Sequence, residues 1–544
     1  MVLGSLGVKS SVLGVGLIVY LIYKTFEPAS VPVTLALLVV LPGLLTAMVQ
    51  NQFDNIFLAI AEVYGGYWTI LVICVAGYRV SPVHPLATFP GPLQCKVSKL
   101  WVTYKATHGN LHKYVHELHA KYGDVAPTSS QYVMQTQLNR SCGTHRKAHN
   151  GSVSQLDGIT DMSVYPKRRK PWNRGTSVAA VKGYEEFLVS VLRELISALE
   201  QRQGQAINLP AWMVYTAFDF MGEMSLSRQF NNVMAGSDTT GFIGAIEVGV
   251  NQLAWISHIP WCAPFMPLLG KMLGDSGSWR SVQKIGSEAV RARIEAGSGR
   301  RDLFHHLMDG DDLEDDKPAI ETVASDGILA IIAGSDTAAT ALSHVFYFLL
   351  RDPKCMERLR EEVQSVYPGA TDTMLDFAKQ ADMPYLNACI NEALRLNPPV
   401  LSGLQKQVIK ATTIGSYFIP EGTVASAHHY SMHRDPRYFY PLPDQFWPER
   451  WLIQDTYTLP SGEVVTKDQL VHNKSVFVPF SIGMRSCPGK SIAMLEMRAV
   501  LCALVQKFEV TAAPGSSLEE WEGNMRDVFI TFLGPLMVNV KARY

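Results

Sequence analysis

One stretch of the sequence, FSIGMRSCPGK at Phe480–Lys490, sets a lone cysteine in front of a segment with helical apolar periodicity. A thiolate there would be stabilised by the free N–H groups and the dipole at the amino end of the helix. Gly483 and Gly489 would let a flat ligand approach the backbone, and Arg485 would offer a cation suited to a carboxylate. The pattern favours a ligand site at Cys487, against the alternative of a buried structural cysteine.

This loop resembles the haem-binding loop, FxxGxRxCxG, of the cytochrome P450 family. Glu392–Arg395 (EALR) is similar to the ExxR motif of that family, and Phe446–Arg450 (FWPER) resembles its FxPER segment. The three motifs also follow the order of the family. The loop residues that match are Phe480, Gly483, Arg485, Cys487 and Gly489.

The resemblance implies a mainly α fold with small β-sheets, a cytochrome P450-like haem-thiolate fold preceded by N-terminal transmembrane helices. It implies haem b as cofactor, with Cys487 as the metal ligand, because an axial thiolate favours O–O cleavage. Glu392 and Arg395 share a helical face, and their burial would need a further partner. Arg450 is the candidate third member of this structural triad; an exposed ion pair is the alternative.

The pentapeptide AGSDT occurs twice, at Ala235–Thr239 and at Ala333–Thr337. The second copy lies in a long apolar helical run, where an aspartate is costly unless it serves a purpose. The first copy reads as a polar turn before a new helix, with Ser237 or Asp238 as a helix cap. The family carries such a motif in its central helix, and only the second copy has the matching distance to the ExxR motif.

The resemblance therefore implies catalytic roles for three residues of the second copy. Gly334 would loosen the helix and make room for dioxygen. Asp336 and Thr337 would hold a water chain that delivers protons to reduced oxygen, which is general acid catalysis through water.

Two regions depart from the family. The expected WxxxR pair, whose arginine binds a haem propionate, corresponds best to Tyr165 and Arg169 in YPKRRKPWNRG, with a solvated basic patch as the alternative. Residues 126–164 do not resemble the strands and loop of the family. They are either a divergent substrate loop or the product of a misassigned reading frame.

The amino-terminal region is strongly apolar. Three runs, at 13–23, 31–49 and 67–78, predict a membrane anchor at 1–80 with one to three transmembrane helices. Four prolines in 81–92 predict a stiff hinge, and 93–544 is then the catalytic domain. Its predicted helices cover Tyr184–Leu199, Ile320–Leu350, Lys354–Val366, Tyr385–Leu396 and Ser491–Phe508, and short strands are predicted in 407–427.

The net charge, the cysteines and the missing redox motifs indicate which partners and which compartment suit this chain. A net charge of −1 gives no sign of a nucleic-acid partner, and eight scattered cysteines fit a reducing compartment. The sequence has no GxGxxG motif of a dinucleotide-binding fold, no flavin site and no iron–sulfur cysteine set. Electrons would therefore come from NADPH through a separate cytochrome P450 reductase.

The leading hypothesis is a membrane-anchored monooxygenase that uses O2 to oxidise a lipophilic small molecule. The chain looks most like fungal microsomal enzymes, including basidiomycete ones, of terpenoid or other secondary metabolism. The expected location is the endoplasmic reticulum membrane, with the catalytic domain facing the cytosol. The alternatives are a haem-thiolate isomerase, dehydratase or peroxygenase, and a haem-free membrane scaffold.

Overall fold

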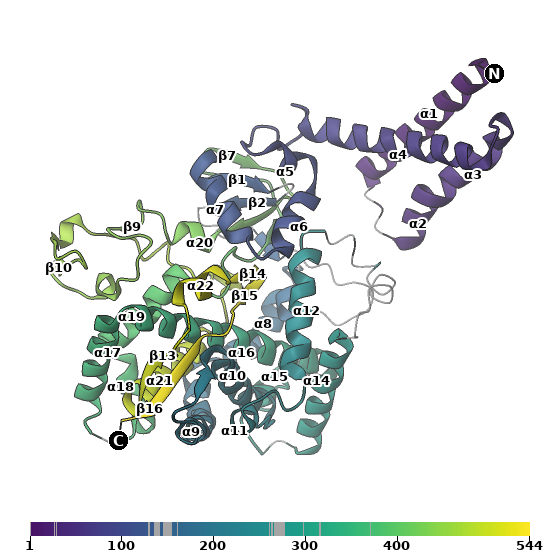
Figure 1. The fold of residues 1–544 in the computed structure, drawn as a ribbon. Coiled ribbons are helices and arrows are strands. Elements are labelled where there is room, and N and C mark those ends of the chain that lie inside the picture. Colours follow the sequence, from purple (N-terminus) through teal and green to yellow (C-terminus); the bar gives the residue numbers. More distant parts are fainter. Residues whose placement is uncertain are drawn as a thin grey trace. The chain divides into compact units, whose positions relative to one another are not determined.

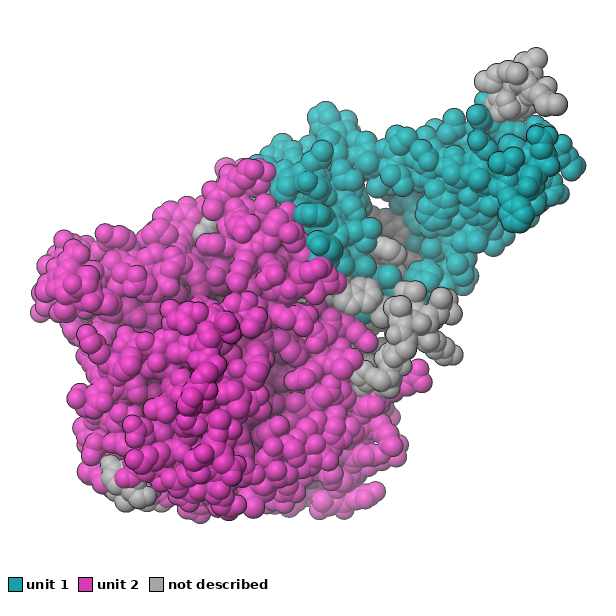
Figure 2. All heavy atoms as spheres, in the orientation of Figure 1, with its two compact units in different colours: residues 1–104, 125–131, 255–276 teal, residues 105–124, 132–254, 277–544 magenta. Residues whose placement is uncertain are grey.

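The computed structural model describes residues 2–26, 28, 30–128, 131–134, 142–144, 155–159, 161–259, 262, 265, 278–297, 299–314, 317–369 and 371–543. The chain divides into two compact units (Figures 1 and 2). The first comprises residues 1–104, 125–131 and 255–276, and the second comprises 105–124, 132–254 and 277–544.

The apolar runs form helices that are longer than the runs themselves. The 13–23 run lies within a helix of 25 residues, and so does the 67–78 run. The Asn55 side chain caps the second of these helices by accepting the Phe57 N–H at 2.8 Å. The helices of this region are α1 Val2–Phe26, α2 Val31–Leu35, the π-helical turn η1 Ala36–Val40, α3 Leu41–Val49, η2 Gln50–Gln52, α4 Ile56–Val80, α5 Leu93–Val97 and α6 Lys99–Thr107.

Four helices of the described chain are long and apolar enough to cross a membrane: Gly7–Phe26, Val31–Gln52, Ile56–Val80 and Ile320–Arg351. The first three are at most 22% buried over the apolar window, whereas the fourth is 61% buried. Burial marks the fourth as a core helix of the second unit. The segment 81–92 between α4 and α5 forms turns and bends, as its prolines predict.

The second unit is mainly helical. Four of the five predicted helices agree with the observed ones to within one residue at each end, whereas the helix Val178–Glu200 begins six residues before the predicted start at Tyr184. Its helices are α7 Leu111–Tyr122, α8 Tyr165–Gly175, α9 Val178–Glu200, α10 Leu209–Leu226, α11 Asn232–Ala235, α12 Phe242–Ile256, α14 Ser278–Glu295, α15 Leu303–Leu307, α16 Ile320–Arg351, α17 Pro353–Val366, α18 Phe377–Ala381, α19 Pro384–Leu396, α20 His429–Met432, α21 Lys490–Lys507 and α22 Leu518–Gly523. The expected fold, mainly α with small sheets, is confirmed.

The strands are short and form small sheets. The predicted strands in 407–427 are present, separated by turns in which Gly415 and Gly422 have φ of +58° and +79°. The central β5 pairs with β3 and β8, and β16 pairs with β13 and β4. The strands are β1 Val125–Thr128, β2 Gln131–Met134, β3 Cys142–Thr144, β4 Ala206–Asn208, β5 Lys406–Val408, β6 Thr412–Ile414, β7 Tyr417–Ile419, β8 Val424–Ala427, β9 Phe439–Tyr440, β10 Thr456–Thr458, β11 Val464–Thr466, β12 Val471–His472, β13 Phe508–Ala512, β14 Arg526–Val528, β15 Ile530–Phe532 and β16 Met537–Ala542.

About half of the divergent stretch 126–164 lies outside the described residues. Its described parts contain three short strands, β1 to β3, and the 3₁₀ turn Leu156–Gly158. The question of a divergent loop or a misassigned frame therefore stays open.

The core of the second unit forms around α16, which packs most extensively on α10 and also contacts α19 and α21. The apolar face of α16 has helical spacing, and its residues from 338 to 349 are buried. This helix carries the second AGSDT copy, whereas α19 and α21 carry Glu392 and the segment after Cys487. One core thus holds the elements of all the predicted motifs.

Candidate functional site

The cysteine loop is a closed turn directly before α21. The Cys487 N–H donates to the Phe480 carbonyl at 2.8 Å, and the Ser486 N–H donates to the Gly483 carbonyl at 3.0 Å. Gly483 has a φ of +78°, a conformation that disfavours other residues. Gly489 is the N-cap residue of α21. The sequence correctly places Cys487 at the amino end of a helix.

The surroundings of the Cys487 sulfur combine burial with hydrogen-bond donors. Burial raises the pKa of the Cys487 thiol above its usual value, and the backbone N–H groups of Gly489 and Lys490 and the charge of Arg169 offset part of this rise. The side chain keeps exposed surface although protein atoms surround the sulfur on most sides. The donors stabilise the thiolate, the form of cysteine that binds metals.

Helix α8 brings the predicted Tyr165–Arg169 pair to this loop. Arg169 Nη1 donates to the Ser486 carbonyl at 2.8 Å and to the Tyr165 hydroxyl at 3.1 Å, and that hydroxyl donates to the Met484 carbonyl at 3.3 Å. The neighbouring Arg168 instead forms an ion pair with Asp326 of α16 at 2.8 Å. Of the two neighbouring arginines, Arg169 therefore faces the cysteine loop, whereas Arg168 faces α16.

Arg485 also contacts α8. Its guanidinium lies 4.1 Å from the centroid of the Tyr165 ring and donates to the Ile159 carbonyl at 2.7 Å. Burial lowers its pKa from the usual value, yet an arginine stays charged at any physiological pH. Two guanidinium groups, of Arg169 and Arg485, therefore flank the loop of Cys487. Phe480, the first loop residue, is half-buried, and Lys490 lies 5.9 Å from its ring centroid.

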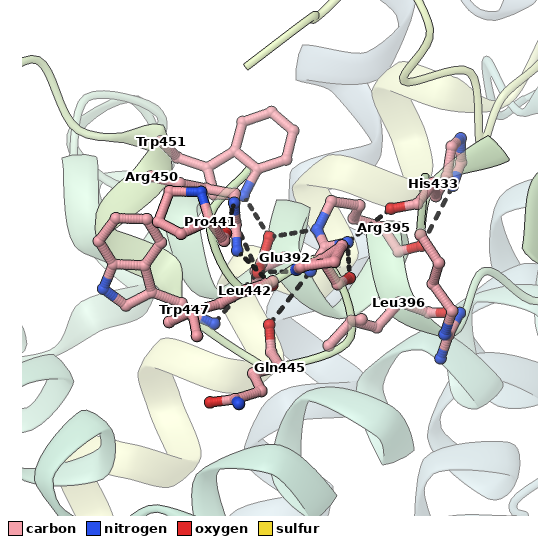
Figure 3. A network of polar contacts seen from close by, with 12 residues as sticks. Glu392, Arg395, Leu396, His433, Pro441, Leu442, Gln445, Trp447, Arg450 and Trp451 are labelled. Carbon is pink, nitrogen blue, oxygen red and sulfur yellow. Dashed lines mark hydrogen bonds and ion pairs between the residues drawn. The ribbon is translucent and has the colours of Figure 1, made fainter. Parts of the chain in front are cut away.

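The predicted triad is present and completely buried (Figure 3). Arg395 Nε lies 2.8 Å from Glu392 Oε2, and Arg450 Nε lies 2.9 Å from Glu392 Oε1. The Trp447 N–H and Trp451 Nε1 also donate to this carboxylate, at 3.1 and 2.9 Å. The two arginines hold the pKa of Glu392 down to about 2 in spite of the burial.

Most of the remaining guanidinium donors of the triad bind backbone carbonyls between β9 and the FWPER segment, and Arg395 Nη1 also donates to the His433 carbonyl at 2.5 Å. Arg450 donates to the carbonyls of Pro441 and Leu442 at 2.9 and 2.7 Å, and Arg395 donates to that of Gln445 at 3.1 Å (Figure 3). Buried charges persist where such bonds satisfy them. The triad therefore fixes a long irregular segment onto α19.

Three contributors to this region were not predicted from the sequence. Trp451 and Asp326 bind their partners across more than fifty positions, and local spacing does not reveal such contacts. The third, His433, accepts the Val478 N–H at Nε2 (3.2 Å), and its Nδ1 lies 3.1 Å from the Arg395 carbonyl oxygen. His433 thereby links the triad to the irregular segment before Phe480. Its burial lowers its pKa well below the usual value.

The second AGSDT copy lies in the middle of α16, as predicted. The Thr337 hydroxyl donates to the Ala333 carbonyl, one turn earlier, at 2.7 Å. Burial and the charge of Glu247 on α12 raise the pKa of Asp336 to about 7. Asp336 can therefore gain or lose a proton near neutral pH.

Gly334 has a clear packing function. A Cβ added at this position would lie 2.4 Å from Met221 Cε on α10, so the absence of a side chain allows α10 and α16 to approach closely. The predicted role of Gly334 in admitting dioxygen stays a prediction.

The first AGSDT copy lies in the turn between α11 and α12. Asp238 Oδ2 accepts the Gly244 N–H in the first turn of α12 at 3.0 Å, which confirms Asp238 as a cap. Thr239 donates to the Phe230 carbonyl at 2.6 Å. Of the two residues predicted as the possible cap, Asp238 is the one that accepts an N–H of α12, and Thr240 accepts that of Phe242 at 3.3 Å.

We expect Gly334→Ala to be less stable than Gly244→Ala by about 1–3 kcal/mol. Both variants gain the helix propensity of alanine, but only the methyl group at position 334 overpacks, against Met221. Gly244→Ala is the matched control: its Cβ meets only Asp238, at 3.8 Å, and alanine favours a helix. Thermal melting of the detergent-solubilised protein measures both. Equal melting temperatures for the two variants would contradict the proposed close contact.

The raised pKa of Asp336 predicts a pH-dependent effect on stability. In the folded chain this carboxyl keeps its proton up to a pH of about 7, whereas the ordinary value is 3.8. The folded state then binds more protons, so this group lowers stability as pH rises from about 4 to 7. The Asp336→Asn variant should gain stability relative to the wild type over that range. A difference in melting temperature between the variant and the wild type that stays constant from pH 4 to 8 would contradict this.

Comparison with known proteins identifies the family of this chain. Residues 88–534 match the family model for cytochrome P450. The chain is 28% identical over 495 residues to the cytochrome P450 monooxygenase orf5 of Eupenicillium brefeldianum, covering 87% of this chain and 94% of that protein. It is 30% identical over 468 residues to the cytochrome P450 monooxygenase nodW of Hypoxylon pulicicidum, covering 84% and 82%.

Two further matches concern a named activity and a solved fold. The chain is 28% identical over 486 residues to the tryprostatin B 6-hydroxylase of Neosartorya fischeri, covering 86% of this chain and 83% of that protein. The crystal structure of the haem domain of cytochrome P450DA superposes with a TM-score of 0.66 at 17% identity, covering 80% of this chain and 94% of that one. The chain therefore belongs to the cytochrome P450 family and is a cytochrome P450 monooxygenase of the kind found in fungal secondary metabolism.

Proposed function

We propose that Cys487 supplies the axial thiolate to the iron of haem b. The observation that carries this proposal is the set of donors around the sulfur, the N–H groups of Gly489 and Lys490 with Arg169 beside them. A Cβ at Gly489 would lie 3.9 Å from the Cys487 sulfur, so glycine keeps that side of the sulfur free of a side chain. The residues present therefore fit a flat cofactor bound through this sulfur.

The other loop residues would bind the cofactor around its edge. When bound, the haem supplies the iron at which O2 is activated. Arg169 and Arg485 offer guanidinium groups suited to its carboxylates. Phe480, Gly483 and Gly489 give the loop its shape. Asp336 and Thr337 would hold and transfer protons, and the pKa of about 7 at Asp336 suits that role at neutral pH.

We further propose that the chain takes its electrons from NADPH through a separate cytochrome P450 reductase. With O2 it would hydroxylate or otherwise oxidise a lipophilic small molecule. The fungal relatives, one of which is named for the hydroxylation of tryprostatin B, favour a terpenoid or another secondary metabolite as substrate. The three apolar helices support attachment to the endoplasmic reticulum membrane, with the catalytic region facing the cytosol.

The two AGSDT copies offer a direct test. We expect Thr337→Ala to raise the hydrogen peroxide released per NADPH oxidised, because a hydroxyl of the proposed proton path is lost. Thr239→Ala is the matched control, since its hydroxyl serves the turn at Phe230. The assay uses reductase, NADPH and the compound that most perturbs the haem spectrum among a set of terpenoids and aromatics. Equal peroxide yields from the two variants would contradict the assignment.

A further inference from the structure

The amino-terminal helices pack with a regular register, all within the first unit. A Cβ at Gly66 of α4 would lie 3.4 Å from Val12 of α1, and one at Gly16 would lie 2.3 Å from Ile70. Further along, Lys24 Nζ lies 4.1 Å from the centroid of the Tyr78 ring. In each of these three pairs, the α4 residue lies 54 positions after the α1 residue. The helices α1 and α4 therefore run parallel, with their carboxyl ends at the same level.

Helix α3 and the π-helical turn before it run the other way along α4. The Tyr67 hydroxyl donates to the Leu37 carbonyl and the Tyr64 hydroxyl to the Val39 carbonyl, both at 2.7 Å. From Leu37 to Val39 the residue number rises, whereas the number of the α4 partner falls from Tyr67 to Tyr64. The chain thus passes along the bundle in one direction, back, and again in the first direction.

One of these bonds satisfies a backbone group that a proline leaves without a donor. The Leu41 N–H binds the Ala36 carbonyl, five residues back, and Pro42, which follows, has no N–H for the Leu37 carbonyl. Tyr67, which is fully buried, supplies that missing donor from α4. In a hydrocarbon surrounding, a proline within a helix is tolerated when a neighbouring helix satisfies the freed backbone group.

The charged side chains of these helices lie near their ends. Lys9 and Glu62 fall at one level of the α1–α4 register, and Lys24 and Arg79 lie at the other end. The segment 31–52 has no charged residue. Side chains at the two levels can extend toward the interfaces.

The outward faces of these helices are apolar, with large exposed side chains on every helix. On α1 they include Leu13, Leu17, Ile18 and Leu21, on the middle segment Val39, Val40, Leu44 and Met48, and on α4 Phe57, Trp68, Val72 and Ile73. The three spans of 20, 22 and 25 residues meet the length of ~20 residues that crosses a bilayer. The acyl chains of a lipid bilayer fit such a surface all around the bundle.

We propose that this bundle crosses the membrane three times. The amino end of α1 and residues 50–55 then lie on one side. The carboxyl end of α1, the amino end of α2 and the proline segment 81–92 lie on the other, where the catalytic region begins. Lys24, Arg79, Lys96 and Lys99 belong to the second side and only Lys9 is near the first, so the positive-inside rule makes the second side cytosolic. This topology rests on the proposed membrane attachment.

Glycosylation mapping of the full chain in endoplasmic reticulum microsomes tests this topology. A flexible segment with an Asn-Ser-Thr acceptor is inserted ahead of Val2, between Gln52 and Phe53, or between Ser81 and Pro82. We expect glycosylation at the first two positions and none at the third. A Gln52–Phe53 insert that stays unmodified while the Val2 insert is modified would overturn the three crossings. Modification of the Ser81–Pro82 insert alone would overturn the orientation.

Alkaline carbonate extraction separates the topology from the membrane attachment itself. If the wild-type chain stays in the pellet, the glycosylation pattern decides the number of crossings. If carbonate releases the chain, the proposed attachment fails and the topology fails with it.

The parallel packing has its own matched pair of variants. Leucine at Gly16 would collide with Ile70, whereas a Cβ at Gly14 has no atom within 4 Å among the described residues. After a protease site placed between Gln52 and Phe53 is cut, the two parts of the wild-type chain should co-purify in mild detergent. Gly16→Leu should lower the recovered partner several-fold, and Gly14→Leu should not. Equal recovery from both variants would overturn the packing of α1 against α4.

Discussion

We expect Glu392→Ala to be the most destabilising single substitution in the ExxR triad. It would leave Arg395 and Arg450, each 0% exposed, without the carboxylate that both of them bind. Removal of one partner from a buried ion pair costs about 3–5 kcal/mol, and a whole domain is stable by only about 5–15 kcal/mol. A large fraction of the molecules should therefore fail to fold or to retain haem.

Glu449→Ala is the matched control for this experiment. Glu449 precedes Arg450, but it pairs with the half-exposed Arg358, and such a pair contributes about 1 kcal/mol or less. Chemical denaturation in detergent compares the two variants. Arg450→Lys, which keeps the charge but loses donors to Pro441 and Leu442, should lie between them. Similar stabilities of Glu392→Ala and Glu449→Ala would contradict the structural role of the triad.

The same carboxylate has an effect at low pH. Its pKa in the folded chain is about 2, against an ordinary value of 4.5. A lowered pKa means that the ionised form stabilises the fold above pH 4.5, and that this contribution is lost as pH falls toward 2. Glu392→Gln should lose less stability than the wild type over this acid range, although it starts from a lower value.

The parts of the fold that local sequence patterns encode could be predicted well. The apolar runs of α16 and α21 give their positions to within a residue or two, because most of each run is buried in the core. The triad follows from the three-residue spacing of Glu392 and Arg395 together with the family motif. The cap at Asp238 follows from the preference of aspartate for helix starts.

The remaining features depend on contacts between distant parts of the chain. Trp451 reaches Glu392 across 59 positions, and Gly334 owes its close approach to Met221 of another helix. The apolar runs at 13–23 and 67–78 are shorter than the helices that contain them, because Lys9 and Glu62 interrupt the apolar composition but not the helices. A helix tolerates such residues near its ends, where their charges can reach an interface.

The second large effect concerns Cys487. Replacement by alanine removes the only side chain of the loop that can ligate iron as a thiolate, so we expect loss of the haem-thiolate spectrum and of all NADPH-dependent oxidation. Cys502→Ala is the matched control, because Cys502 is a buried residue of α21 whose side chain packs in the core. That variant should keep both the spectrum and the activity.

The carbon monoxide difference spectrum of the reduced, membrane-expressed chain tests the central assignment most directly. We expect the wild type and Cys502→Ala to show the red-shifted Soret band of a thiolate-ligated haem, and Cys487→Ala to lack it while melting as a folded protein. A folded wild-type chain without this band, or a Cys487→Ala chain that retains it, would contradict the assignment of Cys487 as the axial ligand.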